Sequence, residues 1–440
     1  MIEQEILIYT HKITSRNKYI FNLFFHHILN VKHRITSDDG VFKEYSGAKF
    51  SYTLHPLNDE LFFLSKHLLF ETGIKEQTIS VYDWEDSKIF FPTGKNSAMP
   101  FDPFAAGFYL VSRYEEYLPH IRDKHNRFDA KESLAFQNNF LHKPLVNEWA
   151  KKVKHLISER FREFQFPETA YRFISTIDID NAFAYREKGL VRSIGGYIRS
   201  FLKGDFAEIS ERTKVLLGKQ RDPYDTYDYQ LEIQEKYKLR PIYFFLLGDY
   251  AVNDKNIPAE NKKFQALIKK LADYADVGIH PSYNSAENVE KIKKEVGKLT
   301  KTLNREITKS RQHFLRLKFP ETYRTLIEVD ITDDYTMGYA DYVGFRASIC
   351  TPFHFYDLDM ESETRLTIHP FAVMECTLKQ YMNIPPEEAM NFIKPLVDAV
   401  KKVDGVFIML WHNETLSDLG MWQNWRRIYE ETIEYAIEKQ

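Results

Sequence analysis

The chain has 440 residues, 43% of them hydrophobic, which is enough for a sizeable core and for two or three domains. Its 60 basic and 63 acidic residues are mixed along the sequence and give a formal charge of −3, which argues against a nucleic acid or an anionic membrane as a partner. The two cysteines, Cys350 and Cys376, are too few for a disulfide framework or a cysteine-rich zinc site.

The N-terminal sequence lacks a basic start followed by an apolar segment and a small-residue cleavage site. Apolar residues nowhere run far enough to span a bilayer. We therefore expect a cytoplasmic protein that does not insert into membranes.

Residues 1–165 predict a smaller mixed α/β domain whose role the sequence does not reveal. A strand over residues 5–13 and an aromatic-rich helix over 16–30 open it. A later helix begins at Asp102 as N-cap, with Pro103 at its first position. A helix over residues 144–163 leads to a domain boundary near residue 165.

Three charged residues near the end of the Pro103 helix allow two interpretations. Arg113, Glu115 and Glu116 are typical of a solvated helix face or of a salt bridge at a domain interface, and a functional site is the alternative. We favour the first interpretation.

From residue 171 onward, apolar strands alternate with helices, so we expect residues 166–440 to form an α/β domain, a seven-stranded parallel (β/α) barrel with its chemistry at the C-terminal strand ends. The predicted strands lie within 173–180, 240–250, 276–283, 310–317, 338–349, 365–375 and 405–413. The predicted helices cover 224–238, 259–274, 286–308, 320–329 and 385–403.

The first of these strands ends in two acids, Asp178 and Asp180. Residues two apart on a strand point to the same face, so both carboxylates converge. On its own, such a pair fits a turn cap with a salt bridge as well as it fits a site. Further polar residues close other strands of the predicted barrel, namely His280, Arg311, His313 and His412. Imidazole and carboxylate together suit a divalent ion such as zinc, with one position left for water.

These motifs resemble those of the polysaccharide deacetylases, the NodB-homology group of carbohydrate esterases. TIDID at 176–180 is similar to the motif that pairs a base with a metal ligand, with Ile179 inserted between the acids. HPSYN is similar to the second motif, but Asn284 stands where that motif has its second histidine. SRQHFL and LWHNE resemble the third and fifth motifs, and DPFAAGFYLVSRYEEY resembles the extra N-terminal domain of a bacterial subgroup.

The resemblance implies metal-assisted hydrolysis of an N-acetyl or O-acetyl group on a sugar or glycan substrate, as part of carbohydrate metabolism. It assigns a divalent ion, with zinc expected, to Asp180 and His280, with His313 as the expected third ligand. Asp178 is the expected general base, oriented by Arg311, and His412 protonates the leaving group. The candidate substrate contacts are Tyr283, Arg346 and Trp411.

Several alternatives stay open at this point. Asn284 could be a poor ligand that leaves metal binding weak, and the inserted Ile179 leaves open which of Asp178 and Asp180 contacts the metal. The protein could be an inactive binding or scaffolding unit in glycan assembly. It could also be a metal-dependent hydrolase of a non-sugar amide.

Overall fold

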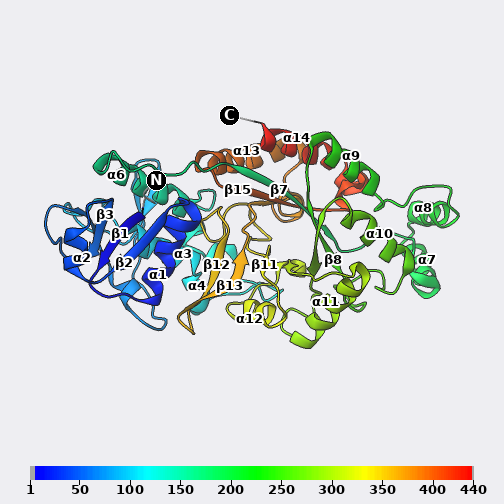
Figure 1. Cartoon of the computed structure of the whole chain (residues 1–440). Helices are drawn as coiled ribbons and strands as arrows, with labels where there is room; N and C mark the ends of the chain where they lie inside the picture. The colour runs from blue at the N-terminus through cyan, green and yellow to red at the C-terminus, as the bar shows by residue number, and fades with distance from the viewer. Residues whose placement is uncertain (1–4, 439–440) are drawn as a thin grey trace.

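The computed structural model describes residues 5–438, which form a smaller N-terminal region and a larger second region, each built around its own β-sheet (Figure 1). The strands of the N-terminal region are β1 (Glu5–Thr10), β2 (Lys32–Thr36), β3 (Lys49–Thr53), β4 (Leu61–Leu64), β5 (Tyr82–Trp84) and β6 (Ser87–Ile89). Its helices are α1 (Ser15–Phe21), which continues as a π-helix over Asn22–Ile28, α2 (Asp39–Glu44), α3 (Pro103–Val111), α4 (Tyr114–Tyr117), α5 (Leu134–Gln137) and α6 (Leu145–Arg160).

The N-terminal sheet has four parallel strands in the order β2-β1-β3-β4. Its core is aromatic: the ring of Phe104 on α3 contacts those of Phe21 and Phe50 at centroid distances of 5.0 and 5.9 Å. Asp102 caps α3 as predicted, since its carboxylate accepts the amide hydrogens of Phe104 and Ala105.

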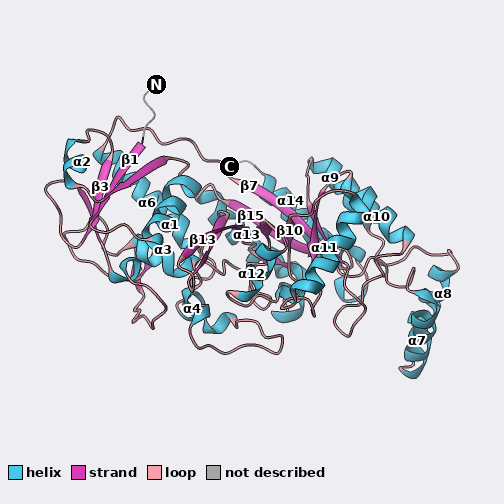
Figure 2. Ribbon diagram, turned by 60° about the horizontal axis from the view of Figure 1, so that its bottom comes forward, coloured by secondary structure: helices cyan, strands magenta, loops and turns pink. Residues whose placement is uncertain are grey.

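The second region carries the strands that the sequence predicts to hold the chemistry. Its strands are β7 (Arg172–Ile179), β8 (Ile242–Leu246), β9 (Asp276–His280), β10 (Lys309–Ser310), β11 (Asp333–Asp334), β12 (Phe353–Asp357), β13 (Ser362–Ile368), β14 (Val373–Met374) and β15 (Val406–His412). Its helices are α7 (Gly189–Leu202), α8 (Phe206–Leu216), α9 (Tyr227–Tyr237), α10 (Lys262–Ala272), α11 (Val289–Leu303), α12 (Glu321–Glu328), α13 (Pro386–Lys402) and α14 (Trp425–Ile437). Figure 2 shows α9 to α14 beside the sheet and α7 and α8 projecting away from it. Among the residues 5–438, none of these helices is both long and apolar enough to cross a membrane.

The nine strands are ordered β12-β13-β11-β10-β9-β8-β7-β15-β14, and every neighbouring pair except β12 and β13 is parallel. The predicted closed seven-stranded barrel is not confirmed, because β12 and β14 remain the two edges of the sheet over the described residues. Three of these strands, β10, β11 and β14, are only two residues long, and 338–349 forms no strand. The edge strand β14 therefore offers few backbone groups for pairing with the opposite edge.

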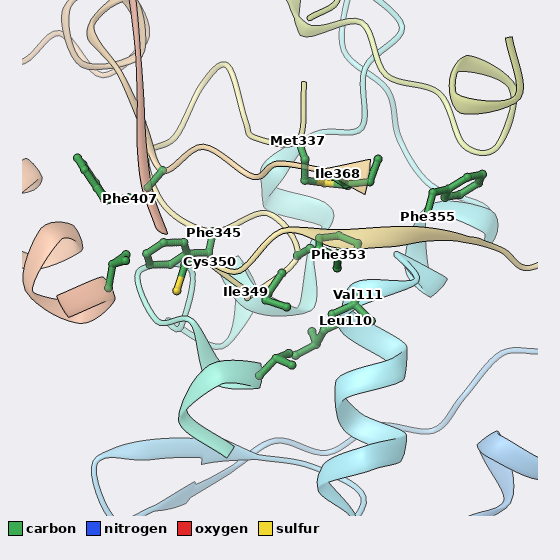
Figure 3. Packing of buried hydrophobic residues seen from close by; sticks show 14 of the residues in the cluster. Leu110, Val111, Met337, Phe345, Ile349, Cys350, Phe353, Phe355, Ile368 and Phe407 are labelled. Carbon is green, nitrogen blue, oxygen red and sulfur yellow. The ribbon is translucent and has the colours of Figure 1, made fainter. Parts of the chain in front are cut away.

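Apolar side chains connect the two regions. Leu110 and Val111 at the end of α3 lie beside Ile349 and Phe353 of the second region (Figure 3), and all four are buried. Both regions therefore share one continuous hydrophobic core.

A buried ion network crosses the same contact. Both guanidinium nitrogens Nε and Nη2 of Arg346 donate to the carboxylate of Glu116, at 2.9 and 2.6 Å, and Arg113 donates to Glu116 at 2.8 Å. Burial alone would raise the pKa of Glu116, but the charges of Arg346 and Arg113 outweigh it and lower that pKa. The salt bridge between the regions, which the sequence favours together with a solvated helix face, is formed by Glu116 with Arg346, and Arg113 supports Glu116 from its own region.

Replacing Arg346 by alanine should lower the free energy of unfolding by about 3 kcal/mol, because Glu116 then stays buried with one of its two cations missing. Urea unfolding followed by circular dichroism measures this change. The matched control is Arg365→Ala, which removes the exposed pair with Asp330 and should cost less than about 1 kcal/mol. Equal losses for the two variants would contradict the assigned role of the buried network.

Candidate functional site

The site forms where parallel strands end at one edge of the sheet. Strand β7 lies between β8 and β15, and β9 follows on the far side of β8. The register pairs His412 of β15 with Asp178 of β7, and His280 of β9 with Leu246 of β8. Since the strands run in the same direction, their terminal side chains meet above this edge.

Arg311 and His313 reach the site from the chain just beyond β10. Strand β10 ends at Ser310, earlier than predicted, yet the amides of Arg311 and His313 still donate to the carbonyls of Ile279 and Pro281. The backbone therefore continues the strand alternation far enough to turn both side chains to the same side. The next two residues, Phe314 and Leu315, have positive φ values of 60° and 53°, and this left-handed turn ends the alternation.

Asp178 forms a fully buried ion pair with Arg311. The Nη1 group of Arg311 donates to Asp178 Oδ1 at 2.9 Å and to the hydroxyl of Thr176 at 2.8 Å, while its Nε group donates to the carbonyl of Tyr335. These bonds fix the guanidinium, so one carboxylate oxygen of Asp178 is occupied. The other oxygen, Oδ2, lies 3.8 Å from His280 Nε2 and faces the group described next.

Asp180, His280 and His313 bring three possible metal-binding atoms together. Asp180 Oδ1 lies 3.1 Å from His280 Nε2, and Asp180 Oδ2 lies 3.3 Å from His313 Nε2. All three side chains can present ligand atoms within 4.8 Å of one another. The structure thus brings together the three residues that the sequence predicts as metal ligands.

The hydrogen bonds of the two imidazoles show which nitrogen is available. His280 Nδ1 lies 2.6 Å from the carbonyl oxygen of Arg311, and His313 Nδ1 lies 2.8 Å from Asp254 Oδ1. Because a carbonyl and a carboxylate can only accept, each Nδ1 carries a hydrogen, and in the neutral ring each Nε2 presents a lone pair. This is the arrangement that orients histidine ligands at metal sites.

The donor set fits a divalent cation. Asp180 Oδ1 is buried without a well-oriented hydrogen bond, and it faces the Nε2 atoms rather than a fixed donor. Two imidazole nitrogens and one carboxylate oxygen are the ligands of many catalytic zinc sites. When no ion is bound, a proton takes its place: burial lowers the pKa of His313, but the charge of Asp180 and hydrogen bonds to Asp180 and Asp254 outweigh it and raise that pKa to about 9.

His412 and Glu375 form a second imidazole–carboxylate pair on another side of the site. His412 Nδ1 donates to Glu375 Oε1 at 2.8 Å, and Glu375 also accepts the backbone amide of His412 and the hydroxyl of Thr415. The other ring nitrogen, Nε2, lies 4.0 Å from Asp180 Oδ2. Burial lowers the pKa of His412, yet the charge of Glu375 outweighs it and raises that pKa well above its usual range.

Within residues 5–438, two further groups of side chains bring possible metal-binding atoms together. Glu375, Cys376 and His412 form one, and His27, His354 and Glu363 form the other. Burial raises the pKa of the Cys376 thiol to about 12, so this sulfur stays protonated and is a weak ligand at neutral pH. The Asp180 group is therefore the better metal site of the two that adjoin the strand ends.

Asp178, the Asp180 group and His412 line a cavity of about 210 Å³. Its wall also contains Phe314, Tyr381 and Arg127, whose guanidinium lies 5.8 Å from the ring centroid of Tyr381. Glu414 lies on the same wall, and burial together with the charge of Asp180 raises its pKa to about 7. The cavity thus offers aromatic surface and several hydrogen-bonding groups beside the Asp180 group.

The predicted substrate contacts do not line this cavity. Arg346 is buried against Glu116 between the two regions, and Trp411 is buried with its ring 5.4 Å from that of Tyr429. Tyr283 stacks its ring 4.3 Å from the guanidinium of Arg316 outside the cavity wall. Asn284 is exposed, so it does not occupy the ligand position that the resemblance would give it.

The sequence did not predict Asp254, Glu375 or Glu414 as site residues. Asp254 lies in a loop between β8 and α10, and it meets His313 only through the tertiary fold. Glu375 follows the two-residue strand β14, and Glu414 stands two residues after His412 in LWHNE, so for these two residues a position beside a motif was the one available clue.

Comparisons with known proteins give three results. A family described as a family of unknown function (DUF7033) matches residues 6–162. A search of curated proteins finds no match. Solved structures with similarity include a protein from Mycobacterium smegmatis assigned as a polysaccharide deacetylase (13% identity, TM-score 0.39, 61% of this chain and 86% of that one), Puue allantoinase (12%, 0.38, 61% and 84%) and a protein from Pseudomonas aeruginosa PAO1 also assigned as a polysaccharide deacetylase (12%, 0.38, 61% and 85%).

Replacing His313 by alanine should abolish stoichiometric metal binding, because it removes one of three ligand atoms. Elemental analysis after incubation with zinc and gel filtration should give about one ion per wild-type chain and a clear loss in the variant. Asn284→Ala is the matched control and should keep the wild-type content, since Asn284 is exposed. Unchanged metal content in His313→Ala would disprove the ligand assignment.

Replacing Asp254 by asparagine should weaken metal binding without removing a ligand. The amide no longer offers a charged acceptor to His313 Nδ1, so zinc affinity measured by competition with a chelating dye should fall about 10- to 100-fold. Asp249→Asn, in the same loop but exposed and paired with lysines, should leave the affinity unchanged. Equal affinities for wild type and Asp254→Asn would show that this carboxylate does not support the ligand.

Proposed function

We propose that the protein is a metal-dependent hydrolase that removes an acetyl group, in the first instance an N-acetyl group, from a sugar or glycan. One observation carries the proposal: a three-residue ligand group lies in one cavity between an Asp–Arg pair and a His–Glu pair. Amide hydrolysis needs an electrophilic centre, a base and an acid, and these three groups offer each of them.

Asp180, His280 and His313 would hold the ion, which we expect to be zinc. A divalent ion bound there would polarise an acyl carbonyl and lower the pKa of a water molecule. His280 and His313 are each held through Nδ1 by groups outside the ligand set, so little rearrangement of the two imidazoles is needed for them to bind.

Asp178 is the proposed general base. Its Oδ1 is held by Arg311, and its Oδ2 faces the ligand group, so this oxygen can accept a proton from water at that position. The guanidinium of Arg311 favours the ionised carboxylate, which is the form that a base requires. Arg311 acts through Asp178 and is a positioning residue.

His412 is the proposed general acid. Its Nδ1–H bond to Glu375 fixes the ring, and Nε2 points toward Asp180 across the cavity. A protonated Nε2 can pass its hydrogen to the nitrogen or oxygen of the leaving sugar as the acyl bond breaks. The carboxylate of Glu375 stabilises the charged imidazolium, as in other imidazole–carboxylate pairs.

The cavity wall supports a sugar as the leaving group. The rings of Phe314 and Tyr381 lie on the wall, and Glu414 and the Tyr381 hydroxyl supply polar groups. Arg127 holds this part of the wall, since its guanidinium donates to Asp123 and to the carbonyl of Phe314. A pyranose ring has apolar C–H faces and a rim of hydroxyl groups, so both kinds of surface suit it.

Wild-type protein loaded with zinc should release acetate from at least one member of a panel of N-acetylated amino sugars and their oligomers. Asp178→Asn should lower kcat about 100- to 10,000-fold while metal content stays unchanged, because it removes a proton acceptor but no ligand. His412→Gln should also lower kcat at unchanged metal content.

Asn284→Ala is the control variant and should retain full activity. If the zinc-loaded protein released acetate from none of the sugars but from other amides, the sugar assignment would be wrong. If it acted on neither, the binding or scaffolding alternative would replace the enzyme.

A further inference from the structure

Helices α7 and α8 form a hairpin that projects from the end of the second region, as both views of the whole chain show (Figures 1 and 2). The hairpin follows β7 directly, beginning a few residues after Asp180. Its sequence carries apolar side chains that the core of the protein does not use.

The apolar side chains of α7 lie on one exposed face. At 100° per residue they fall within an arc of about 120° around the helix axis. Their exposed fractions are high for residues of this kind: Leu190 77%, Val191 85%, Ile194 49%, Ile198 56%, Phe201 65% and Leu202 78%. Phe206 at the start of α8 adds a further ring with 65% exposure. A contiguous patch of this kind marks an interaction surface.

The opposite face of α7 holds the hairpin together through polar contacts. Tyr197 and Thr213 share a hydrogen bond of 2.9 Å between their hydroxyls, and Ser200 donates to Glu208 at 2.8 Å. Gly196 allows the guanidinium of Arg212 to lie directly against the helix, where a Cβ atom would come within 2.3 Å of it. The hairpin thus turns its polar side inward and its apolar side to solvent.

Basic residues lie on the polar side of α7, outside its apolar arc. Residues 189–204 include Arg192, Arg199 and Lys203 and no acidic residue, although the whole chain has a formal charge of −3. Arg192 donates to the carbonyls of Lys255 and Asn256, and Arg199 pairs with Glu208 of α8, while Lys203 is exposed. A helix with one apolar face and with arginine and lysine on its polar face has the composition of helices that lie in the interface of an anionic membrane. The formal charge of the whole chain argues against an anionic membrane as a partner, but it does not reveal this local excess of basic residues on α7.

We propose that the α7–α8 hairpin docks the protein on the surface of an anionic lipid bilayer. The patch is a ridge on a projecting element, which a soft headgroup layer can surround, whereas a protein partner would need a matching groove. A second copy of the chain fits less well, because residues 189–216 carry five basic and three acidic residues, so two hairpins would meet with the same sign of net charge. The proposal is independent of the chemistry proposed above.

The test is flotation of the full chain with vesicles of phosphatidylcholine, with and without phosphatidylglycerol. Wild type should bind the vesicles that contain phosphatidylglycerol, and Ile194→Asp combined with Phe201→Asp should lower the partition coefficient at least ~10-fold, because two apolar contacts are lost. Lys203→Gln should lower it about fivefold on the anionic vesicles alone. The control, Met360→Asp, alters a side chain with 68% exposure far along the chain and should change nothing.

Three results would overturn the proposal. The first is no binding of wild type to anionic vesicles at low salt. The second is equal binding by wild type and the double variant, or an equal loss in Met360→Asp. The third is a dimer in sedimentation velocity that the double variant converts to monomer, which would show that a second copy covers the face.

Discussion

The buried ion pair between Asp178 and Arg311 is the interaction on which the arrangement of the site depends. Neither charge could stay in the interior alone, since an unpaired buried ion costs several kcal/mol. The pair also joins the end of β7 to the segment after β10, two parts of the sheet with β8 and β9 between them. Its formation places Asp180 and His313, each two residues further along its segment, within contact distance of each other.

Much of the site could be predicted because strand geometry is regular. Alternation on β7 turns Asp178 and Asp180 to one side, and parallel neighbours bring the ends of β7, β9 and β15 to one edge. The same alternation survives beyond β10, because the amides of Arg311 and His313 keep their bonds to the neighbouring chain. This is why His313 could be proposed as a ligand although Asn284 stands in the expected position.

The features of the site that the sequence did not predict depend on contacts between segments that are distant along the chain. Asp254 meets His313 from a loop that has no periodic pattern, and Arg346 is held by Glu116 from the other region rather than by a substrate. The closed barrel that the sequence predicts is not confirmed, because an apolar segment such as 338–349 satisfies the same pattern whether it pairs as a strand or packs as an irregular loop. The N-terminal region packs apolar side chains and the Glu116 ion network against the second region. It also places Arg127 on the cavity wall.

The position of the hairpin adds a second constraint on how the molecule works. Its first helix begins at Gly189, in the segment that leaves the end of β7 through Asp180, so the hairpin and the ligand group belong to one continuous stretch of chain. The assignment of the metal to the Asp180 group is tested most directly by X-ray absorption spectroscopy of the zinc-loaded protein. Zinc bound by Asp180, His280 and His313 should show only nitrogen and oxygen ligands at about 2.0–2.1 Å, with the scattering pattern of two imidazoles. A sulfur ligand near 2.3 Å would place the ion on Cys376 instead and would contradict the assignment to Asp180, His280 and His313.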